Sequence, residues 1–402
     1  MQKQSELNIG TLGHVDHGKT TLVSAITHQW TDVHSESVKR SMTIKLGYAD
    51  ATINRCGDGE NATYTTLDKC PDGSAPVPFR KISFLDAPGH ETLMATAIAG
   101  SSIIDAALFV ISASEPCPMP QTREHLMIIN ALGIKNVIIA QTKVDIVGKE
   151  QAEKHYNQIR TFIKDSVISN APIIPVMANK NINIDVLLAE IAKIKIPDRD
   201  VNADPIMYVA RSFDVNKPGT GINKLVGGVI GGSIIRGKFK IGDEIEIRPG
   251  VNLSRDKQKR ETYEPVITTI DALSAGDQQL DEAMAGGLIA VGTKMDPSFT
   301  KADGLVGQIV GKVGKLPESV NSAVLNYVSL ERTDIPKQAF KNDEPLILGI
   351  GTGTVVGYIK TAKKRSIEVT FNRPVCLDKG AKISVLRNFS QRWRLSGYGM
   401  LV

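Results

Sequence analysis

Residues 13–20 read Gly-His-Val-Asp-His-Gly-Lys-Thr, which matches the Gly-x-x-x-x-Gly-Lys-Thr pattern of a loop that cradles phosphates. Backbone N–H groups of such a loop point at the β-phosphate of a nucleotide, Lys19 adds positive charge, and Thr20 supplies a hydroxyl ligand for Mg²⁺. The pattern requires a strand, a tight loop and a helix N-terminus in that order. It therefore constrains the start of the chain more than any other feature.

The surrounding pattern predicts an α/β sheet. An apolar run at 7–12 predicts a strand before the loop, and Leu22, Ile26 and Trp30 recur at helical spacing after it. Further apolar runs alternate with helical stretches and lie at 82–85, 106–111, 137–140 and 173–177. Buried strands separated by helices are typical of a doubly wound parallel sheet, whose ligands bind at the carboxyl ends of the strands.

In the second half of the chain, the spacing of apolar residues changes. The last helix of the α/β unit is expected to begin with Asn183 as its cap and to stop before Pro197. From Ile206 onward, short apolar strands are separated by glycine turns, which is typical of antiparallel barrels. We expect an α/β doubly wound nucleotide-binding domain followed by two antiparallel β-barrel domains, with limits at 1–203, 204–320 and 321–402.

Composition narrows the class of protein. The 402 residues contain 42% hydrophobic and 23% charged residues, with no apolar run of the ~18 residues that a membrane span requires. With no signal peptide apparent, we expect a cytoplasmic protein without a membrane partner. Four cysteines do not predict a disulfide framework. Residues 358–402 hold ten Lys or Arg against two acids, which suits an RNA or acidic partner or else a solvated basic face.

Two carboxylates are expected to define the nucleotide. Asp86 and Gly89 follow the strand at 82–85 and suit a metal-side carboxylate and an N–H for the γ-phosphate. Thr43 lies where a loop could add a second Mg²⁺ ligand, and the alternative is that it is the first residue of a strand from Thr43 to Ala51. Asp145 can accept both the N1–H and the exocyclic amine of guanine, which predicts GTP rather than ATP.

Residues on neighbouring strand ends complete the expected base and phosphate contacts. Lys143 would pack along the base, and the turn at Ala178 and Asn179 would offer an N–H to the guanine oxygen. The residues expected to bind the nucleotide are Asp16, His17, Gly18, Lys19, Thr20, Thr21, Thr142, Lys143, Asp145, Ala178 and Asn179. The expected metal ligands are Thr20, Thr43 and Asp86.

These motifs resemble those of tRNA-carrying translational GTPases. Longer stretches at 42–49, 211–220 and 227–234 resemble the γ subunit of archaeal and eukaryotic translation initiation factor 2, and the resemblance covers essentially the whole chain. The resemblance implies GTP hydrolysis with catalytic residues Lys19, Asp86, Gly89 and His90, where His90 orients the attacking water. It also implies that Val15 and Met42 form an apolar gate over that histidine.

The resemblance implies a set of partners as well. These are methionyl initiator tRNA, the small ribosomal subunit, and α and β subunits of a heterotrimer. Tyr48 could stack on the terminal adenine or the methionyl ester, or could instead belong to the core. Arg211 and Lys217 are candidate tRNA phosphate contacts, or ordinary surface charges. Alternative functions are an elongation-type aminoacyl-tRNA carrier and a nucleotide-locked scaffold with vestigial GTPase activity.

Three positions depart from the family pattern. Thr142 stands where the guanine motif has asparagine, and Ser41 replaces a common glycine. The family often has two Cys-x-x-Cys pairs, whereas here Cys56 and Cys70 are each followed by glycine three residues later. A structural zinc ion usually has four Cys or His ligands, so we do not expect zinc here.

Overall fold

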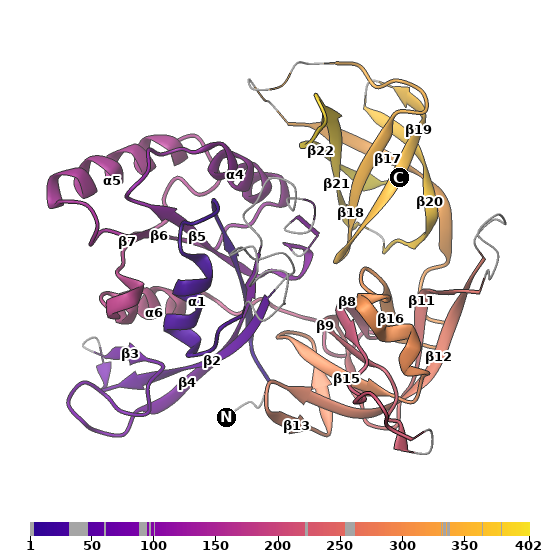
Figure 1. Ribbon diagram of the computed structural model, residues 1–402, viewed down its shortest axis with the longest axis horizontal. Coiled ribbons are helices and arrows are strands. Elements are labelled where there is room, and N and C mark those ends of the chain that lie inside the picture. Colours follow the sequence, from indigo (N-terminus) through magenta and orange to yellow (C-terminus); the bar gives the residue numbers. More distant parts are fainter. Residues whose placement is uncertain are drawn as a thin grey trace. The chain divides into compact units, whose positions relative to one another are not determined.

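The computed structural model describes most of the chain as two compact units (Figure 1). The described residues are 4–31, 47–59, 62–87, 95, 98–99, 101–221, 224–253, 262–330, 332, 335, 338–363, 365–378 and 380–402. The first unit comprises residues 1–97 and 104–197, and the second comprises 98–103 and 198–402. None of the described helices is both long and apolar enough to cross a membrane.

The first unit is built on a seven-stranded sheet with the order β3-β2-β4-β1-β5-β6-β7. Its strands are β1 (Leu7–Leu12), β2 (Gly47–Cys56), β3 (Thr63–Thr65), β4 (Val77–Asp86), β5 (Ala106–Ser112), β6 (Val137–Thr142) and β7 (Ile173–Pro175). The strands from β4 to β7 along this order are parallel, as predicted. The pairings of β2 with β4 and with β3 are antiparallel. The sequence left open a strand from Thr43 to Ala51, which overlaps β2, but it did not predict β3 or the antiparallel pairing.

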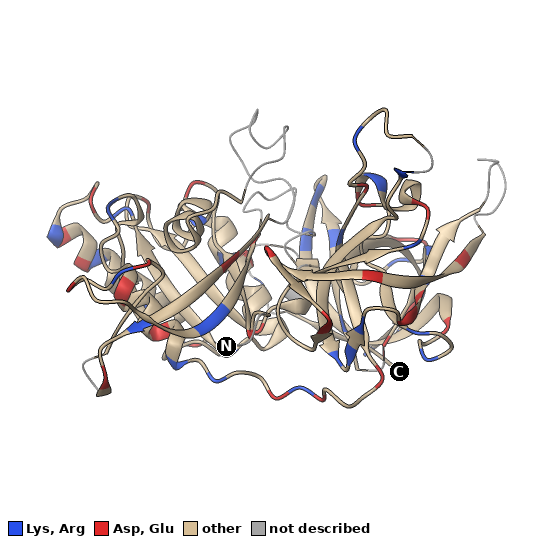
Figure 2. Cartoon of the chain, turned by 90° about the horizontal axis from the view of Figure 1, so that it is seen from below, with Lys and Arg blue, Asp and Glu red and all other residues tan. Residues whose placement is uncertain are grey.

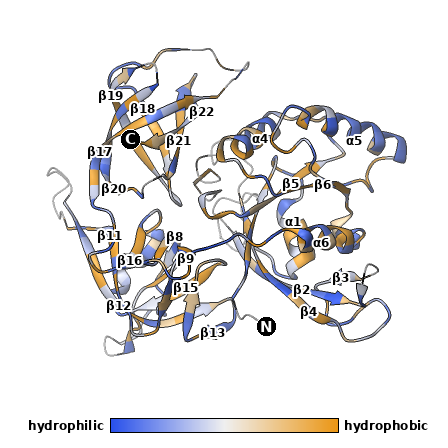
Figure 3. Ribbon diagram, turned by 180° about the vertical axis from the view of Figure 1, so that it is seen from behind, coloured by the Kyte–Doolittle hydropathy of each residue, from blue (hydrophilic) through white to orange (hydrophobic). Residues whose placement is uncertain are grey.

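Helices pack on both faces of this sheet (Figure 1). The helices are α1 (Lys19–Thr27), α4 (Pro120–Leu132), α5 (Lys149–Ile163) and α6 (Ile184–Lys193), with short 3-10 turns η3 (Ser101–Ile103) and η4 (Ala178–Lys180). Residues of α1 and α6 share one apolar cluster with the sheet, and residues of α4 and α5 share the other. On α5 most residues are hydrophilic, while His155, Ile159 and Ile163 are buried (Figure 3). The layers therefore follow the two apolar faces of the strands.

Two helix boundaries differ from the prediction. The first helix ends at Thr27 because His28 takes a left-handed conformation with φ 59°, and Trp30 lies beyond it with 56% of its surface exposed. Asn183 precedes α6, but its side chain does not cap the helix. Its amide instead donates to the carbonyl of Pro175 at 2.7 Å, so the residue ties α6 to the end of β7.

The second unit contains two antiparallel barrels. Its first part comprises β8 (Ile206–Phe213), β9 (Val229–Arg236), β10 (Lys238–Lys240), β11 (Glu244–Asn252), β12 (Tyr263–Ala275), β13 (Gln278–Leu280), β14 (Glu282–Met284), β15 (Ile289–Thr293), η6 (Pro297–Asp303) and β16 (Ile309–Lys312). The sheet order is β11-β16-β8-β9-β15-β12-β13, and the additional pairing of β11 with β12 closes it. The core lies inside this closed sheet.

The second barrel is closed by six strands in the order β17-β20-β19-β18-β21-β22. They are β17 (Ser319–Ser329), β18 (Pro345–Ile350), β19 (Gly353–Lys363), β20 (Ser366–Cys376), β21 (Lys382–Phe389) and β22 (Arg392–Leu401). The expected fold class, an α/β GTPase domain followed by two antiparallel β-barrels, is confirmed. The residue limits of the three domains stay a prediction.

Charged residues are spread over both units (Figure 2). In the C-terminal barrel, Arg387 is buried and bound to Glu344, while Lys360 lies at the surface and forms an ion pair with Glu368 at 2.8 Å. Part of the positive charge at 358–402 is thus used inside the barrel or balanced by neighbouring acids.

The cysteines also differ from the expectation. Cys56, at the end of β2, forms a disulfide with Cys70, and their Cα atoms are 5.7 Å apart. In the antiparallel pairing of β2 with β3, Cys56 lies opposite Thr63, and Cys70 follows five residues after the end of β3; the spacing of the cysteines alone did not reveal their pairing. Gly59 and Gly73 stand where further cysteines would be needed, and no group of three or more candidate metal ligands occurs among the described residues. The cysteine pair therefore does not fit a structural zinc ion.

Candidate nucleotide site

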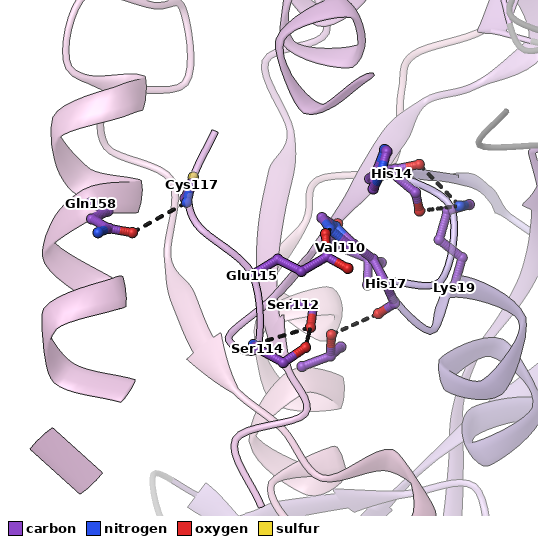
Figure 4. Close-up of polar contacts among 11 residues, drawn as sticks. His14, His17, Lys19, Val110, Ser112, Ser114, Glu115, Cys117 and Gln158 are labelled. Atoms are coloured by element: carbon purple, nitrogen blue, oxygen red, sulfur yellow. Dashed lines mark hydrogen bonds and ion pairs between the residues drawn. The ribbon is translucent and has the colours of Figure 1, made fainter. Parts of the chain in front are cut away.

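The loop between β1 and α1 surrounds the side chain of Lys19. The Nζ of Lys19 donates to the carbonyls of Gly13 at 3.0 Å and His14 at 2.8 Å (Figure 4). Only 7% of the residue is exposed, and this burial lowers the pKa of Lys19 to about 8, against the opposing attraction of Asp86 and Asp16. The ammonium is thus held at the expected phosphate cradle in a poorly hydrated position.

The conformation of the loop explains its glycines. Gly13 has a φ of 144°, and a Cβ there would lie 2.2 Å from the carbonyl oxygen of Val110 on β5. Gly18 has a φ of 86°, in the left-handed region that glycine adopts without strain. Asp16 also has a positive φ, 61°, and is exposed on the turn. A side chain at Gly13 would push the loop away from the sheet.

The carboxylate of Asp86 lies at the end of β4 and accepts three hydroxyl hydrogen bonds. Thr20 donates to Oδ2 at 2.6 Å, Thr31 donates to the same oxygen at 2.8 Å, and Thr11 donates to Oδ1 at 2.7 Å. Asp86 is completely buried. The structure therefore brings together Thr20 and Asp86, two of the three expected metal ligands, and both supply the oxygen atoms that Mg²⁺ prefers.

Sequence reasoning missed two of these donors. Thr11 pairs with Asp86 in the parallel register of β1 and β4, so the register of the sheet was the signal that could have found it. Thr31 lies four residues after the end of α1, where no pattern distinguishes it from other polar residues.

Thr142 connects the base side of the site to the cradle. Its hydroxyl donates to the backbone carbonyl of His17 at 2.7 Å, and both residues are buried. The His17 ring lies between two acceptors, with Nδ1 3.1 Å from the Val110 carbonyl and Nε2 3.3 Å from Glu115 Oε2 (Figure 4). Burial lowers the pKa of His17 to about 4. A neutral imidazole carries one N–H, so it can donate to only one of these acceptors at a time.

Two further histidines lie near His17: His14 belongs to the same loop, and His125 belongs to α4. The rings of His14 and His17 meet edge to face with centroids 5.1 Å apart. His125 of α4 is completely buried, and burial together with the nearby charge of Lys19 lowers its pKa to about 3. Neither ring nitrogen of His125 has a hydrogen-bond partner among the described residues. The sequence analysis did not single out His125.

The residues expected to contact the base follow β6 and β7, which are adjacent parallel strands. Lys143 has a positive φ of 56°. The Oδ2 of Asp145 lies 4.0 Å from the Nζ of Lys180, and 25% of the Asp145 side chain is exposed. Ala178 and Asn179 form the turn η4 after β7. The predicted phosphate, metal and base residues that the structure describes thus lie at or just after the carboxyl ends of β1, β4, β6 and β7.

Some predicted residues cannot be placed in this arrangement. Thr43, Met42, Gly89 and His90 lie outside the described residues, as does Ser41. Thr21 lies in the first turn of α1 and is half-buried. The structure therefore describes the loop at 13–20, Asp86 and the predicted base contacts. The catalytic role of His90 stays a prediction.

The three residues expected to contact tRNA have different surroundings. Tyr48 of β2 is partly buried and packs against an apolar cluster of the first unit, which is the core position left open from the sequence. Arg211 binds Asp303 Oδ1 through its Nε at 2.9 Å. Lys217 is exposed and lines a cavity of about 540 Å³ together with Phe213, Asp214 and Lys301. Their contact with tRNA stays a prediction.

Known families match each part of the chain. The Elongation factor Tu GTP binding domain matches residues 4–197, Elongation factor Tu domain 2 matches 227–311, and the family described as Initiation factor eIF2 gamma, C terminal, matches 319–401. The translation initiation factor 2 subunit gamma of Pyrococcus horikoshii is 50% identical over 406 residues, covering 99% of this chain and 98% of the relative. That of Methanococcus vannielii is 49% identical and covers 99% of both chains.

The chain belongs to the translation initiation factor 2 subunit gamma family. As a member of this gamma-subunit family, it is a GTP-binding initiation factor and a GTPase. These relatives support the initiation factor and not the alternatives of an elongation-type carrier or a vestigial scaffold.

Solved structures agree with the fold of this gamma-subunit family. A bacterial selenocysteine-specific elongation factor, EF-Sec, has a TM-score of 0.74 and 25% identity, and the match covers 99% of this chain and 58% of that one. Elongation factor SelB from Methanococcus maripaludis, solved with a GTP analogue, has a TM-score of 0.73 and 20% identity over 100% of this chain and 80% of that one. The gamma subunit thus shares its fold with translational GTPases.

Proposed function

We propose that this gamma subunit carries methionyl initiator tRNA to the small ribosomal subunit while GTP is bound, and releases it after GTP hydrolysis. The observation that supports the proposal best is the Thr20 hydroxyl 2.6 Å from Asp86, next to the buried ammonium of Lys19. This arrangement suits a site that distinguishes nucleotides by their terminal phosphates. The α and β subunits of the same factor are the further partners that we propose.

Mg²⁺ belongs to the proposed function, and Thr20 and Asp86 would hold it together with Thr43. When bound, the ion neutralises phosphate charge. Lys19 supplies a second positive charge from a buried position, where electrostatic interactions are stronger than in water. His90 would orient the attacking water, with Val15 and Met42 as its apolar gate. Catalysis of this kind rests on positioning and charge stabilisation, so slow hydrolysis is expected without an activating partner.

Asp145 is the proposed determinant of the base. Its carboxylate can accept two hydrogen bonds from guanine, whereas adenine has no matching pair of donors. Competition between GTP and ATP for the protein with Mg²⁺ tests this role. An Asp145→Asn variant is expected to lose most of the preference for GTP, and equal competition by both nucleotides in the unsubstituted protein would refute the assignment.

The tRNA proposal is tested by filter binding of methionyl initiator and methionyl elongator tRNA in the presence of GTP or GDP. We expect retention of the initiator tRNA with GTP and little retention in the other three combinations. Lys19→Ala is expected to abolish the effect of the nucleotide without unfolding the barrels. Equal retention of the two tRNAs would contradict initiator recognition, whereas unchanged GTP affinity of Lys19→Ala would contradict the phosphate cradle.

A further inference from the structure

The Oδ2 atom of Asp86 carries two hydroxyl donors in a fully buried position. Thr20 lies 2.6 Å from this oxygen and Thr31 lies 2.8 Å from it, while Thr11 binds the other carboxylate oxygen. An ionised carboxylate offers about four acceptor positions, two on each oxygen. Two donors therefore fill the acceptor positions of Oδ2, and a new partner at this oxygen must displace one of them.

The two hydroxyls differ in what they would do when Mg²⁺ binds. Thr20 follows Lys19 in the cradle, and donating its proton to Asp86 does not use the oxygen lone pairs with which it would bind the ion. Thr31 is not part of the cradle, and its proton occupies the second acceptor position of Oδ2, the carboxylate oxygen next to Thr20 at which the ion, or a water molecule bound to it, would arrive. Thr31 is therefore the donor that must give way.

The surroundings hold Thr31 against this carboxylate. Thr31 is 7% exposed, and a Cβ on Gly47 would lie 2.8 Å from the Cβ of Thr31. Gly47 is also the residue of β2 that pairs with Asp86 of β4. Thr31 and Gly47 therefore both lie beside the carboxylate of Asp86.

We propose that Thr31 competes with Mg²⁺ for Asp86 and so lowers the affinity of the nucleotide site for the ion. The inference rests on the proposed function, because it takes Thr20 and Asp86 as the metal side of the site. Loss of the Thr31 hydroxyl removes a donor that stabilises the buried carboxylate only while the ion is absent. The metal-free protein is then less stable, and the ion binds more tightly.

The test compares Thr31→Val with Thr31→Ser and with Thr27→Val. Thr27 is as exposed as Thr31, at 7%, but its hydroxyl donates to the Val23 carbonyl inside α1, so it serves as the matched control. Retention of a fluorescent GDP analogue is titrated with Mg²⁺. We expect the Mg²⁺ midpoint of Thr31→Val to fall about tenfold to a hundredfold, the effect of one hydrogen bond to a charged group. Thr31→Ser and Thr27→Val are expected to keep the midpoint of the unsubstituted protein.

Thermal unfolding gives an independent measurement. Without nucleotide and Mg²⁺, Thr31→Val is expected to have a lower melting temperature than the unsubstituted protein. Addition of nucleotide and Mg²⁺ should raise the melting temperature of Thr31→Val by more than it raises that of the unsubstituted protein. A contact that only supports the fold would lower the melting temperature without lowering the Mg²⁺ midpoint, and that outcome would overturn the proposal. Thr31→Ala removes the same hydroxyl and replaces the valine variant if that variant does not fold.

The failure of the proposed metal site would look different. In that case the unsubstituted protein would retain GDP equally with and without Mg²⁺. If instead the unsubstituted protein depends on Mg²⁺ and Thr31→Val has the same or a higher midpoint, the competition is wrong while the metal site stands.

Discussion

The hydroxyl of Thr142 donates to the backbone carbonyl of His17 at 2.7 Å, and this bond ties the end of β6 to the phosphate cradle. The family pattern has asparagine at this position, and the shorter threonine still reaches the loop. The brace on the cradle is therefore present here in a different chemical form. The preference for guanine is expected to survive through Asp145.

Removal of this brace should weaken nucleotide binding without changing the preference for guanine. We expect Thr142→Val to bind GDP about tenfold more weakly, because the buried carbonyl of His17 loses its donor. Thr142→Ser keeps a hydroxyl and should bind close to normally. Thr161→Val, on the surface of α5, is the control. Equilibrium titration with GDP measures the effect, and an unaltered affinity of Thr142→Val would mean that the bond does not support the loop.

The burial of Lys19 should make nucleotide binding sensitive to alkaline pH. The pKa of Lys19 in the free protein is about 8, so above this pH the side chain must take up a proton before it can attract phosphate. We expect GDP affinity to be constant from about pH 7 to 8 and then to fall by up to about tenfold per pH unit. Lys19→Ala should bind weakly at every pH. A flat profile up to about pH 9.5 in the unsubstituted protein would contradict this role.

The lowered pKa of Lys19 should also make the nucleotide-free protein more stable as the pH rises, although nucleotide binding weakens over the same range. An unfolded lysine keeps its proton up to a pKa of about 10.4. The unfolded chain therefore binds more protons than the folded chain between about pH 8 and 10, and Lys19 makes the folded state more stable as the pH rises through this window. Unfolding of the nucleotide-free protein by urea, compared with Lys19→Met, isolates this contribution.

The disulfide between Cys56 and Cys70 should stabilise the segment that carries β3. The two cysteines are 14 residues apart in sequence, and closing a loop of this size contributes about 3 kcal/mol in the chain-entropy description. Reductant should lower the melting temperature of the first unit and leave that of a Cys56→Ala, Cys70→Ala variant unchanged. Alkylation of the denatured chain should label two cysteines without reductant and four with it. Four labelled cysteines without reductant would exclude the pairing.

The ion pair between the buried Arg387 and the partly buried Glu344 should hold one end of the C-terminal barrel together. Two guanidinium nitrogens of Arg387 bind the carboxylate at 2.6 and 2.9 Å, and the group also donates to the carbonyls of Gln338 and Ala339. We expect Arg387→Lys to destabilise the barrel by about 3 kcal/mol, because an ammonium cannot reproduce the planar set of donors.

Hydrogen exchange of the β18 and β21 amides measures this loss locally. The control is Lys360→Ala, which removes an exposed ion pair with Glu368 and should barely change exchange. Equal effects of the two substitutions would show that the buried pair contributes no more than a surface one.

The sequence by itself determined the strand, loop and helix around 13–20, the alternation of strands and helices up to Pro197, and the barrels after Ile206. These features depend on local spacing and periodicity, which a single sequence displays directly. It also placed Asp86 and Asp145 at strand ends, because the loops after parallel strands gather at one edge of the sheet.

Only the tertiary structure decided which side chains meet at that edge. The hydroxyls of Thr11 and Thr31 reach Asp86 from 75 and 55 residues away, and Thr142 reaches His17 across 125 residues. The pairing of Cys56 with Cys70 was likewise not visible in the sequence pattern, because it depends on the path of the chain after β3. Hydrogen bonds and cross-links of this kind depend on strand register and chain path, and neither leaves a periodic trace in the sequence. Local pattern thus predicted where the nucleotide site lies, while long-range packing decided how the Asp86 carboxylate and the loop at 13–20 are held.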